Sequence, residues 1–173
     1  MGKCHLETIM TLCTGLNAYL SPGGEILDRI AIIYVSLHHH NTKKVIEEMA
    51  EQRALDIIKL SEAPEIDWSQ YKYIGFASGV YFQQLHKGLL ALAAGIALSA
   101  WQKTFIVYTC GFNYKNYART MEATLKRKPA DFIGTFHCRG YDTYGWFKFI
   151  GGIAKNHPNS RDLRRARVFI SSI

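Results

Sequence analysis

The sequence predicts an α/β domain built on a parallel sheet, and three observations carry this prediction. From residue 30 onward, short apolar segments alternate with amphipathic segments of helical length, as in parallel-sheet proteins. The first of them, Ile30–Val35, is apolar almost throughout, as expected of a strand buried on both faces. With 173 residues, 48% of them hydrophobic, the chain is long enough for one domain with a single core.

The segments follow one another in the rhythm of a doubly wound sheet. Five strands fit a three-layer sandwich with helices on both faces and the strand order 2-1-3-4-5. In sheets of this order the ligand lies beyond the carboxyl ends of strands 1 and 3. The expected strands are Ile30–Val35, 54–59, 73–77, 104–109 and 131–137.

Four helices are expected between and after these strands. The first, Asn41–Gln52, carries apolar side chains on one face. Residues 89–101 form the longest apolar run, which favours a buried helix. Pro158-Asn159-Ser160 is a start signal for the last helix. The expected helices are Asn41–Gln52, 84–101, 114–126 and Ser160–Ser171.

Residues 1–28 stand outside this pattern. Ser21-Pro22-Gly23-Gly24 indicates a break between them and the first strand. We expect residues 29–173 to form the domain and residues 1–28 to be an N-terminal extension, either disordered or a helix laid on the surface. A start codon assigned too early is the third alternative.

Composition and charge restrict the setting and the partners. The net charge of +7 favours partners with an acidic surface, and it also allows binding to polyanions. No stretch of about 18 or more apolar residues occurs, so no membrane insertion is expected. Cys4, Cys13, Cys110 and Cys138 form no CxxC pair, which is typical of a reduced, cytoplasmic setting.

The junction between the first strand and the first helix is the most informative local feature. It reads Ser36-Leu37-His38-His39-His40-Asn41-Thr42 and is rich in hydroxyl, imidazole and amide groups. Free backbone N–H groups and the helix dipole favour an anion at such a helix start, so a ligand that carries phosphate is expected here. A metal site on the histidines is the weaker alternative, because no carboxylate or cysteine lies at a ligand spacing.

Three further loops follow the carboxyl ends of strands 3, 4 and 5, and each pairs a glycine with an aromatic residue. Glycine lets the backbone approach a flat ring closely, and Tyr or Phe can stack on its face. Together with the junction they predict a site for a phosphate joined to a planar ring. The loops read Ser78-Gly79-Val80-Tyr81-Phe82, Cys110-Gly111-Phe112-Asn113-Tyr114 and Cys138-Arg139-Gly140-Tyr141-Asp142-Thr143-Tyr144-Gly145.

These pieces resemble the flavodoxin family, in its short single-domain form with a Ser-x-His-His-x-Asn-Thr phosphate loop. The likeness covers residues 30–173, with the motifs in the right order and spacing. It continues beyond the last loop through Ile150-Gly151-Gly152-Ile153 to His157-Pro158-Asn159.

The resemblance implies non-covalently bound FMN, with the redox chemistry supplied by the flavin. It also implies that the peptide at Gly79 rearranges when the flavin is reduced. The implied phosphate contacts are Ser36, His38, His39, His40, Asn41 and Thr42. One side of the isoalloxazine ring would be lined by Ser78, Gly79, Val80 and Tyr81, and the other by Cys110, Gly111, Phe112, Asn113, Cys138, Arg139 and Asp142.

Three features depart from the family pattern. His40 replaces the usual glycine of the phosphate loop, and a positive φ there would cost a histidine roughly 1–2 kcal/mol. Trp146 stands where relatives usually carry a proline. The chain is basic, whereas flavodoxins are usually acidic, so their usual partners do not carry over.

Three functions fit these observations. The first is an FMN electron carrier that cycles between redox partners, docks a partner with an acidic surface and is not itself an enzyme. The second is a small flavin-dependent reductase that takes hydride from a nicotinamide cofactor and passes it to a quinone or flavin. The third is a scaffold without flavin that binds an acidic partner; nucleic acid is the less expected one.

Overall fold

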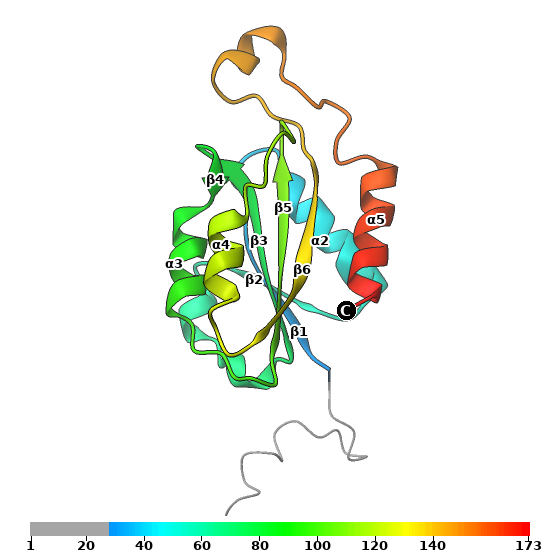
Figure 1. Ribbon diagram of the computed structural model, residues 1–173. Coiled ribbons are helices and arrows are strands. Elements are labelled where there is room, and N and C mark those ends of the chain that lie inside the picture. The colour runs from blue at the N-terminus through cyan, green and yellow to red at the C-terminus, as the bar shows by residue number, and fades with distance from the viewer. Residues whose placement is uncertain (1–27) are drawn as a thin grey trace, which may run out of the picture.

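The computed structural model describes residues 28–173, which form a three-layer α/β sandwich (Figure 1). The expected N-terminal extension, except for Asp28, lies outside the described residues. Five parallel strands have the order β2-β1-β3-β5-β6, which confirms the predicted order 2-1-3-4-5. A sixth strand, β4, pairs antiparallel with the end of β3. The strands are β1 (Ile30–Val35), β2 (Asp56–Lys59), β3 (Tyr73–Tyr81), β4 (Gln84–Leu85), β5 (Lys103–Cys110) and β6 (Asp131–Arg139).

The helices cover both faces of the sheet. α2 (Asn41–Gln52) and α5 (Ser160–Ser171) pack together on one face, and α3 (Lys87–Gly95) and α4 (Arg119–Leu125) lie on the other (Figure 1). No helix among residues 28–173 is long and apolar enough to cross a membrane.

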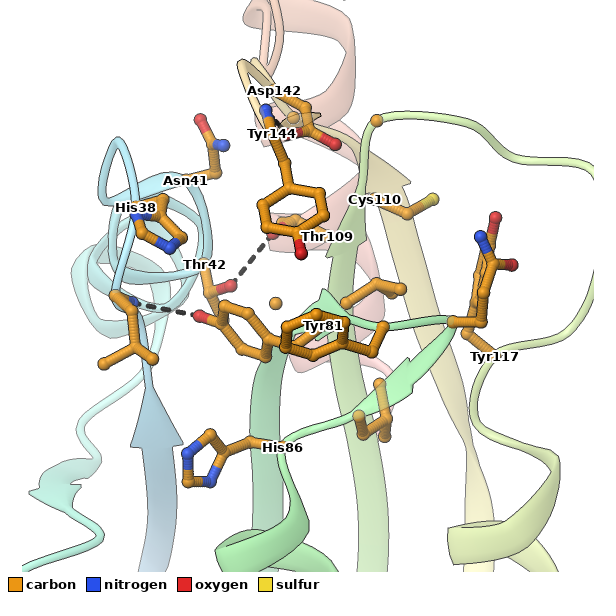
Figure 2. A pocket seen from close by; sticks show the side chains of 18 of the residues that line it. His38, Asn41, Thr42, Tyr81, His86, Thr109, Cys110, Tyr117, Asp142 and Tyr144 are labelled. Atoms are coloured by element: carbon orange, nitrogen blue, oxygen red, sulfur yellow. Dashed lines mark hydrogen bonds between the residues drawn. The ribbon is translucent and has the colours of Figure 1, made fainter. Parts of the chain in front are cut away.

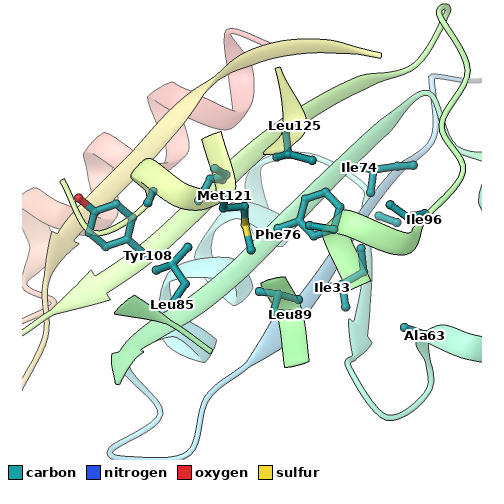
Figure 3. Packing of buried hydrophobic residues seen from close by; sticks show 14 of the residues in the cluster. Ile33, Ala63, Ile74, Phe76, Leu85, Leu89, Ile96, Tyr108, Met121 and Leu125 are labelled. Carbon is teal, nitrogen blue, oxygen red and sulfur yellow. The ribbon is translucent and has the colours of Figure 1, made fainter. Parts of the chain in front are cut away.

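Each face of the sheet has its own apolar core, and β1 contributes to both. Ile33 of β1 packs with Phe76, Leu89 and Met121 beneath α3 and α4 (Figure 3). Its neighbour Ile32 packs on the opposite face with side chains of α2 and α5. Successive side chains of a strand point to opposite faces, so a strand between two helical layers must be apolar throughout. This confirms the interpretation of Ile30–Val35.

The expected helix over residues 84–101 is wrong at its start. β3 continues to Tyr81, four residues beyond the predicted end, and the chain then turns through Phe82 and Gln83, both with positive φ. Residues 84–85 pair back onto β3 as β4, so the helix begins only at Lys87. A two-residue turn without glycine or asparagine gives no hairpin signal in the sequence.

The same helix also ends earlier than expected. Its last bond runs from the Ile96 N–H to the Leu92 carbonyl, and Ile96 is extended. Ile96 and Leu98 are buried as irregular chain, so the apolar run of residues 89–101 fills the core without continuing the helix. Apolar runs alone do not distinguish these two outcomes.

Two other helix starts can be compared with the sequence. The helix expected at residue 114 begins at Arg119, because the Asn116 side chain accepts a hydrogen bond from the Ala118 N–H and forms a turn before it. The expected start of α5 is confirmed. There the Asn159 side chain accepts from the N–H groups of residues 161 and 162, and the Asp162 carboxylate accepts from the Asn159 N–H.

One titratable side chain of this fold predicts a pH effect on stability. Burial, reinforced by the charge of Arg165, lowers the pKa of His137 from its usual 6.5. The unfolded chain then binds this proton more readily, so stability falls as the pH decreases through that value. We expect the loss of melting temperature between about pH 7.5 and about pH 5.5 to be smaller in His137→Gln than in the wild type. Equal losses would contradict the prediction.

Candidate functional site

A cavity of about 570 Å³ opens at the carboxyl edge of the sheet (Figure 2). Its walls come from the segments that follow β1, β3, β5 and β6, within residues 36–42, 79–87, 109–117 and 140–147. A volume of this size is in the range of small-molecule sites. The cavity therefore lies where the strand order predicts a ligand.

One end of the cavity is the loop that leads from β1 into α2. His39 and His40 adopt left-handed backbone conformations, with φ of 54° and 52°. The His40 carbonyl accepts the first helical bond from the Lys44 N–H at 2.9 Å, and no side-chain hydrogen bond caps the helix. The N–H groups of the first turn have no acceptor within the helix, which makes this end suitable for an anion.

The start of α2 is fixed by two side chains. The Thr42 hydroxyl lies 2.9 Å from the hydroxyl of Thr109 at the end of β5, and both residues are buried (Figure 2). The Asn41 amide donates to the Tyr141 carbonyl at 2.7 Å. The side chains of Asn41 and Thr42 were expected to contact a phosphate. In this structure they hold the loop in place, so the backbone N–H groups are the donors that remain available at the helix start.

Tyr81, at the end of β3, crosses the cavity toward the same loop. Its hydroxyl oxygen accepts a hydrogen bond from the Leu37 N–H at 2.9 Å (Figure 2). The ring lies over Gly79, where an added Cβ would stand 2.9 Å from the hydroxyl oxygen. Burial raises the pKa of Tyr81, so its hydroxyl is neutral at physiological pH.

Aromatic rings form the outer rim of the cavity. Phe82 and Tyr144 meet edge to face at 5.4 Å between ring centroids, and Phe112 and Phe147 meet at 5.5 Å. Phe82 is 77% exposed and Tyr144 59%, although both are large aromatic side chains. Exposed aromatic rings at the rim of a cavity suit contact with a flat aromatic ligand.

The wall formed by the loops after β5 and β6 is closely packed. Burial raises the pKa of Cys110 to about 11, so the thiol is protonated and uncharged at pH 7. A Cβ on Gly111 would stand 2.7 Å from the Asp142 side chain. The Asp142 carboxylate accepts from the Tyr144 N–H at 2.8 Å, so it shapes the turn of the last loop.

The cavity brings together most, but not all, of the residues expected there. His39 lies outside it, with its ring 2.8 Å from the Thr143 hydroxyl and 4.4 Å from the Tyr141 ring. Ser78 and Cys138 are buried beneath the surface, and Arg139 bonds the Gly111 carbonyl. The lining residues among those expected are Ser36, His38, Asn41, Thr42, Gly79, Val80, Tyr81, Cys110, Gly111, Phe112 and Asp142; those that do not line it are His39, His40, Ser78, Asn113, Cys138 and Arg139.

Several lining residues were not expected from the sequence. His86 and Lys87 reach the cavity because β4 turns the chain back toward it before α3 begins. The His86 ring stands edge-on to Tyr81 at 5.8 Å and accepts a bond from the Gly88 N–H. The missed residues with polar side chains in the walls include Gln83, Gln84, His86, Lys87, Thr109 and Tyr117.

Within residues 28–173, no group of three or more His, Cys, Asp or Glu side chains is placed to hold a metal ion. Adjacent histidines of the loop also differ in their surroundings, since His38 lines the cavity and His39 bonds Thr143.

A profile of the flavodoxin domain matches residues 31–150. The chain belongs to the flavodoxin family, which is a family of flavoproteins. An uncharacterized protein of Methanocaldococcus jannaschii is 37% identical over 144 residues, which cover 82% of this chain and 95% of that protein.

Solved structures of flavodoxins share the fold. A Fusobacterium nucleatum flavodoxin mutant bound to flavin mononucleotide superposes with a TM-score of 0.55 at 12% identity, over 83% of this chain and 93% of its own. Rubredoxin:oxygen oxidoreductase of Desulfovibrio gigas superposes with a TM-score of 0.57 at 12% identity, over 84% of this chain and 35% of its own. The flavodoxin fold therefore occurs both alone and within larger chains.

His40 replaces the glycine that is usual in flavodoxins, and it adopts a left-handed backbone conformation. A substitution at this position tests whether the histidine is strained. Glycine adopts this conformation without strain, so His40→Gly should raise the free energy of unfolding by about 0.5–1 kcal/mol. His38→Gly is the matched control: His38 is outside the left-handed region, so glycine there should lower stability by a similar amount. Urea unfolding of the ligand-free protein measures both. Destabilisation by both variants would contradict the strain assigned to His40.

Proposed function

We propose that the protein binds FMN non-covalently in the cavity at the carboxyl edge and carries electrons between redox partners. The observation that supports this most is the continuity of one cavity from an uncapped helix start to a rim of exposed aromatic rings. That shape matches a phosphate joined by a chain to a planar ring. Membership of the flavodoxin family supports the same ligand.

The residues present fit each part of FMN. At the α2 end, the backbone N–H groups of the first helical turn and the hydroxyl of Ser36 suit the phosphate. Gly79, Tyr81 and Gly111 line the middle of the cavity, where the ring would lie, and Tyr144 and Phe112 offer aromatic faces at the rim. When bound, FMN supplies the electron transfer, and the protein holds and shields it.

A flavin-binding measurement tests this proposal. We expect the protein to bind one FMN per chain and to bind riboflavin about tenfold more weakly or worse, since charge-assisted hydrogen bonds to phosphate contribute about 1.5–3 kcal/mol. Flavin fluorescence quenching gives both affinities. If neither flavin binds, the proposal fails and the scaffold without flavin takes its place.

Stepwise reduction of the FMN-loaded protein separates a carrier from a reductase. A carrier takes up electrons in two resolved one-electron steps and does not oxidise NAD(P)H faster than free FMN does. Reduction in a single two-electron step, together with rapid NAD(P)H oxidation, would instead assign the protein as a reductase.

We also propose that the partner docks through an acidic surface. Cations stand around the cavity: Lys87 lines it, and the Lys115 ammonium lies over the rings of Tyr114 and Tyr117 at 5.7 and 5.2 Å. Lys148 is exposed in the short helix Gly145–Ile150 beside the rim. This distribution accords with the overall charge of +7 and favours anionic partners.

Small redox molecules can test whether the basic surface around the cavity attracts anions, because they replace a protein partner that is not known. Reoxidation of the FMN-loaded protein by anionic ferricyanide should slow by up to about tenfold from about 0.01 M to about 0.15 M salt, because screening removes the attraction. Lys115→Glu should slow it at low salt. Lys126→Glu, an equal charge change beside Phe132 at the start of β6, should have little effect. Equal effects of the two variants would contradict a local basic surface.

A further inference from the structure

A second groove lies at the amino edge of the sheet, on the face that α3 and α4 cover. Its volume is about 690 Å³, and its walls come from residues 63–69, between β2 and β3, and from residues 91–102, between α3 and the start of β5. Among residues 28–173, no Lys or Arg lines it, and its one carboxylate, Asp67, accepts from the N–H and the hydroxyl of Ser69. An occupant of this groove must therefore be apolar and uncharged.

The wall formed by α3 and the chain after it has the composition of a covered surface. Residues 88–101 contain no charged side chain. α3 buries Leu89 and Ala93 in the core, yet Ala91 and Gly95, which line the groove, are exposed. A surface helix normally carries polar side chains on its outer side, and a helix that is apolar all round is normally covered. The groove therefore calls for an occupant.

The chain enters the described part of the molecule beside this groove. β1 and β3 start side by side at the amino edge. The Arg29 carbonyl accepts hydrogen bonds from the N–H groups of residues 72 and 73, and the Asp28 carboxylate bonds the ammonium of residue 72 at 2.7 Å. Residue 72 closely follows the short helix Trp68–Gln70, which contributes to one wall of the groove. The residues that precede Asp28 are therefore tethered next to the groove.

Residues 8–20 have the sequence that such a groove requires. They lie outside the described residues, and they contain no charged side chain. Ser21-Pro22-Gly23-Gly24 follows them and is a stop signal for a helix. Residues 21–27 span up to about 23 Å when extended, whereas a helix over residues 9–20 is about 18 Å long, so the tether can reach along the groove. Apolar residues recur with helical spacing at Ile9, Leu12, Cys13, Leu16 and Leu20.

We propose that residues 9–20 form an amphipathic helix whose apolar side docks in the groove at the amino edge of the sheet. The tether favours this occupant, because a short linker raises the effective concentration of the segment at the groove to about the mM range. An acidic partner finds no opposite charge in the walls that residues 28–173 provide. A second copy of the described domain presents the same hollow, and one hollow does not fill another.

Hydrogen exchange of the full chain tests the docking from the side of the segment. Leu16→Asp places a carboxylate in the middle of the apolar side, where burial without a partner is strongly unfavourable, so the segment should leave the groove. The amides of Ile96 and Gln102, which are hydrogen-bonded in the groove wall, should then exchange at least about tenfold faster than in the wild type. Thr14→Asp, an equal change of charge on the opposite side of the same helix, should leave these rates unchanged.

A matched pair of variants tests the docking from the side of the groove. Ala91 and Ala94 are both exposed on α3, and of the two only Ala91 lines the groove. Ala91→Asp should accelerate the exchange of the same amides as Leu16→Asp does, and Ala94→Asp should not.

The outcomes separate the possible occupants. Unchanged exchange in Leu16→Asp and Ala91→Asp would overturn the docking, and acceleration by Leu16→Asp alone would place the segment elsewhere and overturn it as well. Light scattering should find a monomer in the wild type. A wild-type dimer that Ala91→Asp dissociates would put a second copy in the groove instead. None of these measurements uses flavin, so the docking and the proposed function can fail independently.

Discussion

The contact between the hydroxyls of Thr42 and Thr109 fixes the start of α2 against the sheet, and the rest of the site depends on the position of this helix start. It joins the first turn of α2 to the carboxyl end of β5, at 2.9 Å and across 67 residues of sequence. Both hydroxyls are buried, and an unpaired buried hydroxyl costs about 1–3 kcal/mol. The start of α2 therefore cannot slide along the sheet without leaving two polar groups unsatisfied.

The other walls of the cavity are positioned from this point outward. Asn41, next to Thr42, bonds the Tyr141 carbonyl and draws the loop after β6 against the helix start. A Cβ on Gly140 would stand 2.8 Å from the Asn41 side chain, so only glycine allows this approach. Leu37 and Tyr81 bring the end of β3 to the same loop. Three neighbouring strands thus meet around one helix terminus, and the space left between them is the cavity.

Much of this arrangement could be predicted from the sequence, because the signals are local. Ile30–Val35 had to be apolar on both faces, and the polar residues that follow it mark the carboxyl edge of the sheet. Glycines beside aromatic residues marked three of the loops. These patterns determine which segments meet at the edge of a parallel sheet, and the flavodoxin family assignment agrees with them.

Features that depend on contacts between distant parts of the chain could not be predicted from the sequence. Phe82 and Gln83 form a turn with positive φ that no glycine announces, so β4 and the cavity residues His86 and Lys87 were assigned to a helix. Ser78 and Cys138 were expected at the ligand because they neighbour the loops, yet the alternation of a strand turns them into the interior. His39 and His40 adopt a conformation that their residue type does not favour, since the connection to α2 imposes it.

Backbone amide shifts of an isotope-labelled protein titrated with FMN test most directly whether the flavin occupies this cavity. The largest shifts are expected in the segments within residues 36–42, 79–87, 109–117 and 140–147, with Leu37 and Gly79 among them. The groove at the opposite edge, between residues 63–69 and 91–102, serves as the internal reference and should change little. Shifts concentrated in that groove, or spread evenly over the protein, would contradict a flavin site at the carboxyl edge of the sheet.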